Sequence, residues 1–152
     1  MGPKGVALTT VFVVAGILVT LVLLNGTAMG TLIGKVTLPN VGTVKAVGVG
    51  VYWDNSCSNP VTSINWGTVN PGSRKDVTVY IKNEGNAPET LSLEIQNWNP
   101  PAASTYMSLT WDYGGEVISV SGVAKVTLSL SVSNTIEGIT NFSFDIVITG
   151  SG

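Results

Sequence analysis

Residues 76–82 read DVTVYIK, and this short stretch decides the fold class. Its apolar residues Val77, Val79 and Ile81 alternate with polar ones, so apolar and polar side chains lie on opposite sides of an extended chain. A hydrophobic period of two is typical of a β-strand that buries one face. The stretch therefore predicts a strand with one face toward a core and the other toward water.

The same period of two recurs along most of the chain beyond residue 30. Further alternating runs occupy residues 47–53, 91–96, 109–111, 126–132 and 142–148. Turn-forming Asn, Pro and Gly residues separate these runs at 70–73, 83–86, 99–101 and 114–115. About seven short strands, each with one apolar face, need two sheets packed face to face. We therefore expect an all-β fold, an immunoglobulin-like or jelly-roll β-sandwich that spans residues 47–152.

The composition argues against several classes of function. The chain has no histidine, which removes the commonest general base and the commonest metal ligand. Its single cysteine, Cys57, cannot close an internal disulfide, so it is either a buried structural thiol or a bridge to another chain. The formal net charge is −2, which leaves no basic surface for nucleic acid. We expect a protein that is not an enzyme and that needs no cofactor or metal.

Residues 1–28 have the composition of an export segment. Lys4 precedes an uncharged, apolar run over residues 6–24, and small residues follow it. A positive charge, an apolar run and small residues before the cleavage point describe a secretory signal peptide. We expect cleavage between Ala28 and Met29, which places the rest of the chain outside the cell or at its surface.

Two other fates of this segment stay open. A run of this length also suffices to span a bilayer as a hydrophobic helix, so residues 1–28 can act as an uncleaved membrane anchor. Cleavage directly before Val6, as in archaeal type IV pilin-like precursors, would instead leave the helix in the core of a filament. In all three cases the membrane is contacted only through the N-terminal segment.

Residues 29–46 link the export segment to the sandwich. Within them, Leu32, Val36 and Leu38 alternate with Ile33 and other residues, which predicts one extra strand at a free end of the chain. Such a strand can pair within its own domain or fill a groove in a neighbouring copy, a donor strand in the second case. Unpaired sheet edges invite this kind of pairing.

Glycines in the first alternating run bear on where a donor strand would fit. Gly48 and Gly50 lie on the face opposite the valines of residues 47–53, and a flat face lets another backbone approach closely. The alternative is a β-bulge or a bend in this first strand.

One motif carries a resemblance to a known family. Pro71-Gly72, then a strand, then Asn83 and Gly85 resemble the TasA/camelysin-like extracellular filament proteins, in particular their archaeal branch of bundling-pilus-type subunits. The resemblance implies a signal peptide, a jelly-roll or Ig-like sandwich and an N-terminal strand donated to the next subunit. It implies no cofactor, and the peptidase activity once attached to camelysin has no catalytic residues here.

A few residues are candidates for smaller sites. Asn141 begins the tripeptide Asn-Phe-Ser, an acceptor for N-glycosylation. Asp54, Asp112 and Glu116 could gather at one end of the sandwich around a calcium ion, although turn charges in solvent are the simpler interpretation. Trp98 is expected to point outward and to sit at a subunit contact, while the other tryptophans fill the core.

These observations together favour a non-catalytic structural subunit of an extracellular filament, pilus or biofilm matrix. Its partners would be identical copies of the chain, a homo-oligomer assembled by N-terminal donor-strand exchange. A membrane-anchored Ig-like surface domain that binds a partner, and a type IV pilin-like subunit that keeps its hydrophobic helix, are the alternatives.

Overall fold

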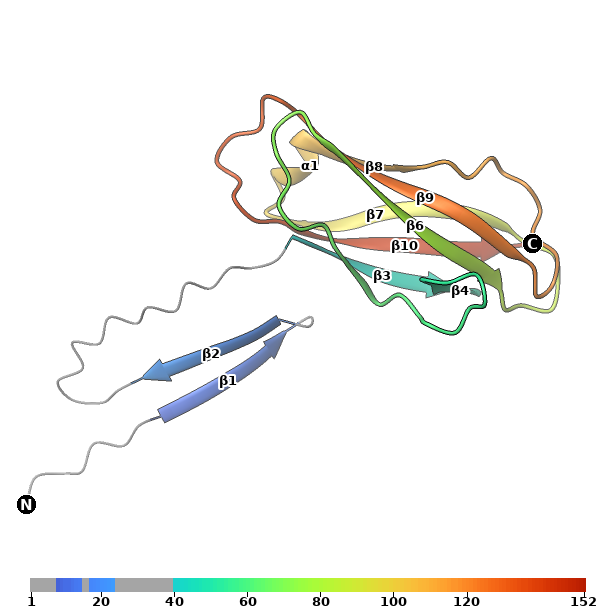
Figure 1. The fold of residues 1–152 in the computed structure, drawn as a ribbon, viewed down its shortest axis with the longest axis horizontal. Coiled ribbons are helices and arrows are strands. Elements are labelled where there is room, and N and C mark those ends of the chain that lie inside the picture. The colour runs from blue at the N-terminus through green and yellow to red at the C-terminus, as the bar shows by residue number, and fades with distance from the viewer. Residues whose placement is uncertain (1–7, 15–16, 24–39) are drawn as a thin grey trace, which may run out of the picture. The chain divides into compact units, whose positions relative to one another are not determined.

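The structure is a computed structural model that describes residues 8–14, 17–23 and 40–152. It divides into two compact units, Met1–Leu38 and Pro39–Gly152 (Figure 1). The predicted cleavage residues Ala28 and Met29 lie outside the described residues. So do the predicted donor-strand residues, which are Leu32, Ile33, Val36 and Leu38.

The first unit contains a hairpin. Strands β1 (Leu8–Val14) and β2 (Ile17–Leu23) pair antiparallel. The N-terminal helix that the sequence predicted is therefore not confirmed. The two strands are rich in Val and Thr, whose β-branched side chains favour strands. Within the described part of the chain, no helix has the length and hydropathy of a membrane span.

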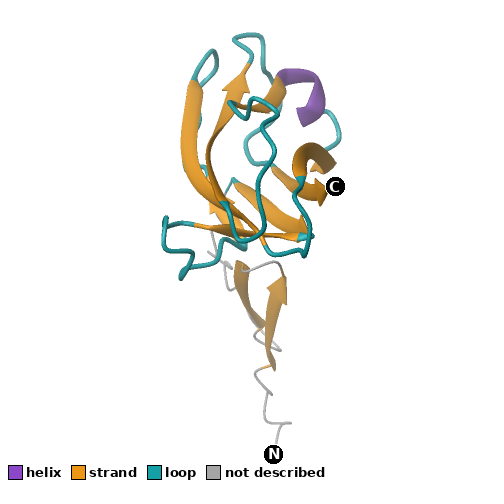
Figure 2. Ribbon diagram, turned by 90° about the vertical axis from the view of Figure 1, so that its right-hand side faces the viewer, coloured by secondary structure: helices purple, strands orange, loops and turns teal. Residues whose placement is uncertain are grey.

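The second unit is all-β, as predicted, and consists of two four-stranded sheets. One sheet has the strand order β5-β3-β10-β7 and the other has the order β4-β6-β9-β8. Their bounds are β3 Val41–Val47, β4 Val49–Tyr52, β5 Ser63–Asn65, β6 Arg74–Asn83, β7 Thr90–Asn99, β8 Met107–Trp111, β9 Val123–Val132 and β10 Ser143–Ser151. A single helical turn, α1 (Ala103–Tyr106), connects β7 to β8 (Figure 2). All strand pairs of this unit are antiparallel except β3 and β10, which run parallel.

The core lies between the two sheets and is built from the alternating residues. Val79, Ile81, Val126, Leu128 and Ile146 are fully buried. Burying an aliphatic side chain of this size contributes about 1.5–3 kcal/mol. The alternation in the sequence therefore becomes the inner face of each sheet.

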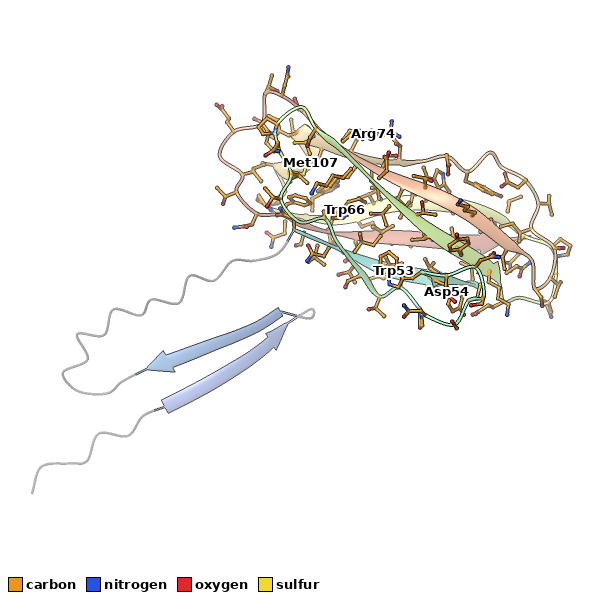
Figure 3. The ribbon with its side chains drawn as sticks, viewed as in Figure 1. Trp53, Asp54, Trp66, Arg74 and Met107 are labelled. Atoms are coloured by element: carbon orange, nitrogen blue, oxygen red, sulfur yellow. The ribbon has the colours of Figure 1, made fainter. Side chains whose placement is uncertain are left out.

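Aromatic rings fill one end of this core. Phe144 contacts Trp66 at a ring-centroid distance of 6.3 Å, Trp98 at 4.5 Å and Phe142 at 6.0 Å. Trp66 lies between the sheets with an exposed fraction of 2% (Figure 3). The cluster fixes β10 against the segment that follows β5.

The first alternating run is broken rather than continuous. Gly48 has a φ of +76°, a conformation open to glycine at little cost, and it separates β3 in one sheet from β4 in the other. Val49 and Val51 are buried as predicted, but Val47 is 55% exposed and Trp53 38% exposed. The sandwich thus includes residues 41–46, which the sequence had placed in a linker.

The structure favours the bend over an open groove at these glycines. A side chain at Gly50 would come within 2.5 Å of the Tyr52 ring, so that ring already covers the space over the glycine. An aromatic ring over a strand glycine restores the contact that the missing side chain loses. A donor strand has no free surface at Gly50.

The outward position predicted for Trp98 is wrong. Asn97 has a φ of +55°, and the register between β7 and β10 shifts at this point. One extra residue in a strand turns every later side chain to the opposite face. Trp98 therefore packs against Phe144 in the core.

The sandwich has two ends, which are the entry end and the far end. The entry end is where the chain enters at Asn40, whose carbonyl accepts a bond from Trp66 N–H at 2.8 Å and whose Oδ1 accepts one from Phe142 N–H at 3.2 Å. The far end holds the end of β3 and the end of β10, because these strands are parallel. Figure 1 shows the entry end beside α1 and the far end beside the C-terminus.

Candidate functional site

The free edge of β7 is the first candidate for an interaction surface. β7 has ten residues and pairs with β10 on one side, and no described strand pairs with its other side. The other outer strands of the sandwich, β4, β5 and β8, have four, three and five residues. β7 is therefore the longest strand at an outer edge of either sheet in the described part of the chain.

The first residues of this edge are covered and the next ones are open. Glu89 exchanges two backbone hydrogen bonds with Ile118, at 3.0 and 2.8 Å, and Leu91 N–H donates to the Tyr113 hydroxyl at 3.1 Å. Ladder bonds alternate from side to side along a strand. Leu93 and Ile95 therefore direct their N–H and C=O groups to the same free side.

The core is incompletely covered beside this edge. Leu93 and Ile95 face the core but are only half-buried, whereas Ile146 and Ile148 on the neighbouring β10 are fully buried. Trp111 and Tyr113, from β8 and the residues after it, are also half-buried there. The apolar side chains between the edges of β7 and β8 thus lack a cover that one more strand would supply.

A cluster of polar side chains, here called the clamp, joins three strands of this sheet, which are β3, β10 and β7. Lys45 on β3 lies 2.6 Å from Asp145 on β10, and Asn97 on β7 donates to the same carboxylate at 2.7 Å. The Lys45 bond, then the Asn97 bond, lower the pKa of Asp145 below its ordinary value. Because the group is charged in the folded state, the clamp holds at neutral pH and weakens as the pH falls through this lowered pKa.

The Pro-Gly part of the family-like motif is a turn. Pro71 and Gly72 lie between β5 and β6, Gly72 has a φ of +72°, and Ser73 N–H donates to Asn70 C=O at 3.1 Å. Proline followed by a residue of positive φ is the signature of a type II turn. The motif positions the start of β6 at the entry end.

The Asn-x-Gly part of the motif is a buried hydrogen-bonding centre at the far end. Asn83 is 1% exposed, its Nδ2 donates to Ala87 C=O at 2.8 Å and to Ile118 C=O at 3.0 Å, and its Oδ1 accepts from Gly85 N–H at 2.8 Å. A side chain at Gly85 would come within 2.5 Å of the Glu89 carboxylate. Asn83 and Gly85 therefore have a structural role, in which the amide ties three loop groups together.

The loop after β4 is organised around one carboxylate. Asp54 accepts bonds from the hydroxyls of Ser56 and Ser58, and from Asn59 N–H at 2.8 Å (Figure 3). The Ser56 bond and then the Ser58 bond hold the pKa of Asp54 well below its usual range. Cys57 lies within this loop as a half-buried free thiol, and burial raises its pKa.

Removing the carboxylate is expected to expose the thiol. In Asp54→Ala the loop loses its hydrogen-bond acceptor, so Cys57 should react several-fold faster with a thiol reagent at pH 7. The lowered pKa means that Asp54 stabilises the loop above its ordinary pKa and stops doing so as the pH falls through the folded value. Asn55→Ala, in the same loop, is the control and should leave the rate unchanged. An equal rate in Asp54→Ala would show that the carboxylate does not hold the loop.

The three carboxylates considered for calcium are not brought together. Asp112 Oδ1 accepts a bond from Thr127 N–H at 2.7 Å, and Glu116 Oε2 accepts one from Gly114 N–H at 3.2 Å, each near its own turn. Asp54 binds its own loop instead. Among the described residues, no three His, Cys, Asp or Glu side chains gather in a way that could hold a metal ion.

Asn141 lies in the loop before β10 and is half-buried. The next residue, Phe142, binds Asn40 through its backbone N–H, so the tripeptide lies where the chain enters the sandwich. Asn141 stays a predicted glycosylation site.

Two features of the sheet that contains β7 were not predicted from the sequence. The cover over the start of β7, made by Tyr113 and Ile118, depends on a long loop that folds back across the sheets. The parallel partner of β10 is β3, whose two faces in VGTVKAV are about equally apolar. Val41 and Val44 are the residues of that stretch whose β-branched side chains indicate a strand.

Comparison of the chain with protein-family models gives no match, and neither does comparison with curated proteins.

Proposed function

We propose that this chain is a non-catalytic structural subunit of an extracellular filament, built from identical copies that exchange N-terminal strands. The observation that carries the proposal is the open edge at Leu93 and Ile95, where a sheet lacks a strand and the core lacks a cover. The occupant is residues 29–38 of a second copy, whose alternating Leu32, Val36 and Leu38 have the pattern of a half-buried strand. A TasA/camelysin-like ancestry, with export through the N-terminal segment as a cleaved signal or a helical anchor, fits the same picture.

The strand order supports an immunoglobulin-like version of the sandwich. The order β4-β6-β9-β8 matches strands A-B-E-D of that fold, and β7 beside β10 matches C beside F. The connections agree, since β8 and β9 pair directly while the chain changes sheets from β6 to β7 and from β9 to β10. The place of strand G, next to F, is taken by β3, so an N-terminal strand already completes one sheet within the subunit.

Removing the donor segment tests the proposal. A chain of residues 29–152 should form filaments visible by electron microscopy, and a chain of residues 40–152 should remain monomeric. The shorter chain keeps Asn40 because its side chain donates to Gly67 C=O at 2.7 Å and its Oδ1 accepts from Phe142. Circular dichroism should show the same β-sheet signal for both.

A matched control separates sequence pattern from length. In the chain 29–152, replacing Leu32, Val36 and Leu38 by serine keeps the segment but removes its apolar face, and filaments should be lost. Replacing Thr31 and Thr37 by serine should leave assembly intact. Filaments from a folded chain 40–152 would refute strand donation.

A further inference from the structure

Four of the large apolar side chains exposed on the sandwich gather at its far end. Val47 is 55% exposed, Val117 67%, Val120 47% and Val123 40%. The remaining one among the described residues, Trp53, lies in the loop after β4. Exposed apolar side chains are ordinary when scattered, but a group of them in one place marks an interaction surface.

Backbone contacts show that these valines share one end. Asn83 at the end of β6 exchanges bonds with the turn before Val123, through Gly122 C=O at 3.0 Å and Ser121 N–H at 3.1 Å. Val49, next to the bend at Gly48, is the register partner of Asn83. Val117 and Val120 are close to Ile118 in the loop that crosses the start of β7.

We infer that this far end is the docking surface for the entry end of the copy that donates its strand, and that the donated strand runs antiparallel to β7. The inference rests on the proposed function. β7 starts at the far end with Thr90 and finishes at the entry end with Asn99. A strand antiparallel to β7 would therefore run toward the far end and stop beside the cover that Tyr113 and Ile118 make over the first residues of β7, with Leu38 there.

The length of the connection then places the second body. Residue 38 is two residues from Asn40, where the donating copy enters its own sandwich, so at most about 7 Å of chain separates the two bodies. The entry end of the donor must lie against the far end of the acceptor. A parallel strand would finish at the acceptor's entry end and leave the four valines uncovered.

The chemistry of the two ends agrees with this head-to-tail contact. The far-end loops, residues 84–89 and 112–122, contain Glu84, Glu89, Asp112 and Glu116 but no Lys or Arg. At the far end Lys82 on β6 partly offsets these acids, and at the entry end Arg74 on β6 pairs with Asp76 at 2.8 Å, so charge contributes little to this contact. The entry end also has half-buried apolar side chains, which are Val69, Ile136 and Ile139.

Cross-linking tests the contact in the chain 29–152, which contains the whole sandwich and its core. In a Cys57→Ser background, Val120→Cys marks the far end and Glu137→Cys marks the entry end. Filaments of the double variant, treated with a short bis-maleimide, should yield a ladder of covalent multimers. Each single variant should yield no covalent multimers under the same treatment. Covalent dimers from Val120→Cys alone, or intact filaments of the double variant without a ladder, would overturn the inference.

A second measurement keeps this result separate from strand donation itself. Val117→Lys with Val120→Lys should raise the concentration needed for filament growth severalfold, while Ser119→Lys should change it little. The same chains should still bind a fluorescent peptide of residues 29–38, because β7 is unaltered. Normal filament growth of the variant with Val117→Lys and Val120→Lys refutes the far-end contact alone. Failure of the wild-type chain to bind the peptide refutes the proposed function.

Discussion

Leu93→Lys is expected to abolish filament formation while leaving the subunit folded. Leu93 is half-buried at the open edge of β7 and faces the space that a donated strand would cover. In the monomer a lysine can extend its ammonium group past that edge into water. An incoming strand would have to bury this charge, and inward-pointing charges are a natural means of blocking sheet edges. Sedimentation and electron microscopy measure the outcome.

Ser92→Lys is the matched control for this substitution. Ser92 precedes Leu93 on the same strand and is exposed on the outer face of the sheet, so it adds the same charge without entering the covered space. Filaments should form from Ser92→Lys at nearly the wild-type concentration. Equal assembly by both variants would exclude β7 as the acceptor, and a collapsed circular dichroism spectrum in Leu93→Lys would call for Leu93→Asn as the replacement test.

Asn83→Asp is expected to lower the free energy of unfolding by about 1–3 kcal/mol, because the Ala87 carbonyl loses its donor, whereas the Ile118 carbonyl still accepts a bond from Glu89 N–H. The new carboxylate keeps the acceptor for Gly85 N–H but cannot donate to Ala87 or Ile118. The loss should shrink at low pH, since a buried carboxyl facing carbonyl oxygens has a raised pKa and donates once protonated. Urea unfolding followed by tryptophan fluorescence measures it.

Asn86→Asp is the control, because it adds the same negative charge three residues further along the chain. Asn86 is exposed in the same turn, so the substitution should change stability by no more than about 0.5 kcal/mol. A similar small effect in Asn83→Asp would mean that the amide is not the centre of the far-end loops.

The strands with clear alternation could be predicted from the sequence. The runs at 76–82, 91–96, 126–132 and 142–148 correspond to β6, β7, β9 and β10, because each buries one face and exposes the other. The uniformly apolar N-terminal run has no such contrast, so periodicity alone could not separate a helix from the hairpin β1–β2.

The candidate site depended on facts that no local pattern contains. Whether β7 is an edge depends on the order of strands across the sheet, which joins segments far apart in the chain. The burial of Trp98 depends on the backbone of Asn97, where one residue of positive φ reverses the faces. The role of Asn83 could be predicted only as a motif, since its partner Ile118 lies on a distant loop.

The parallel pairing of β3 with β10 also bears on how a subunit would respond to tension. β3 starts at the entry end and β10 finishes at the far end, and their register extends from Val41 opposite Ser143 to Val47 opposite Thr149. A pull along the filament, applied at those two ends, slides one strand along the other. All the hydrogen bonds between them then bear the load at once instead of opening one after another, so the geometry suits a fibre that must resist stretching.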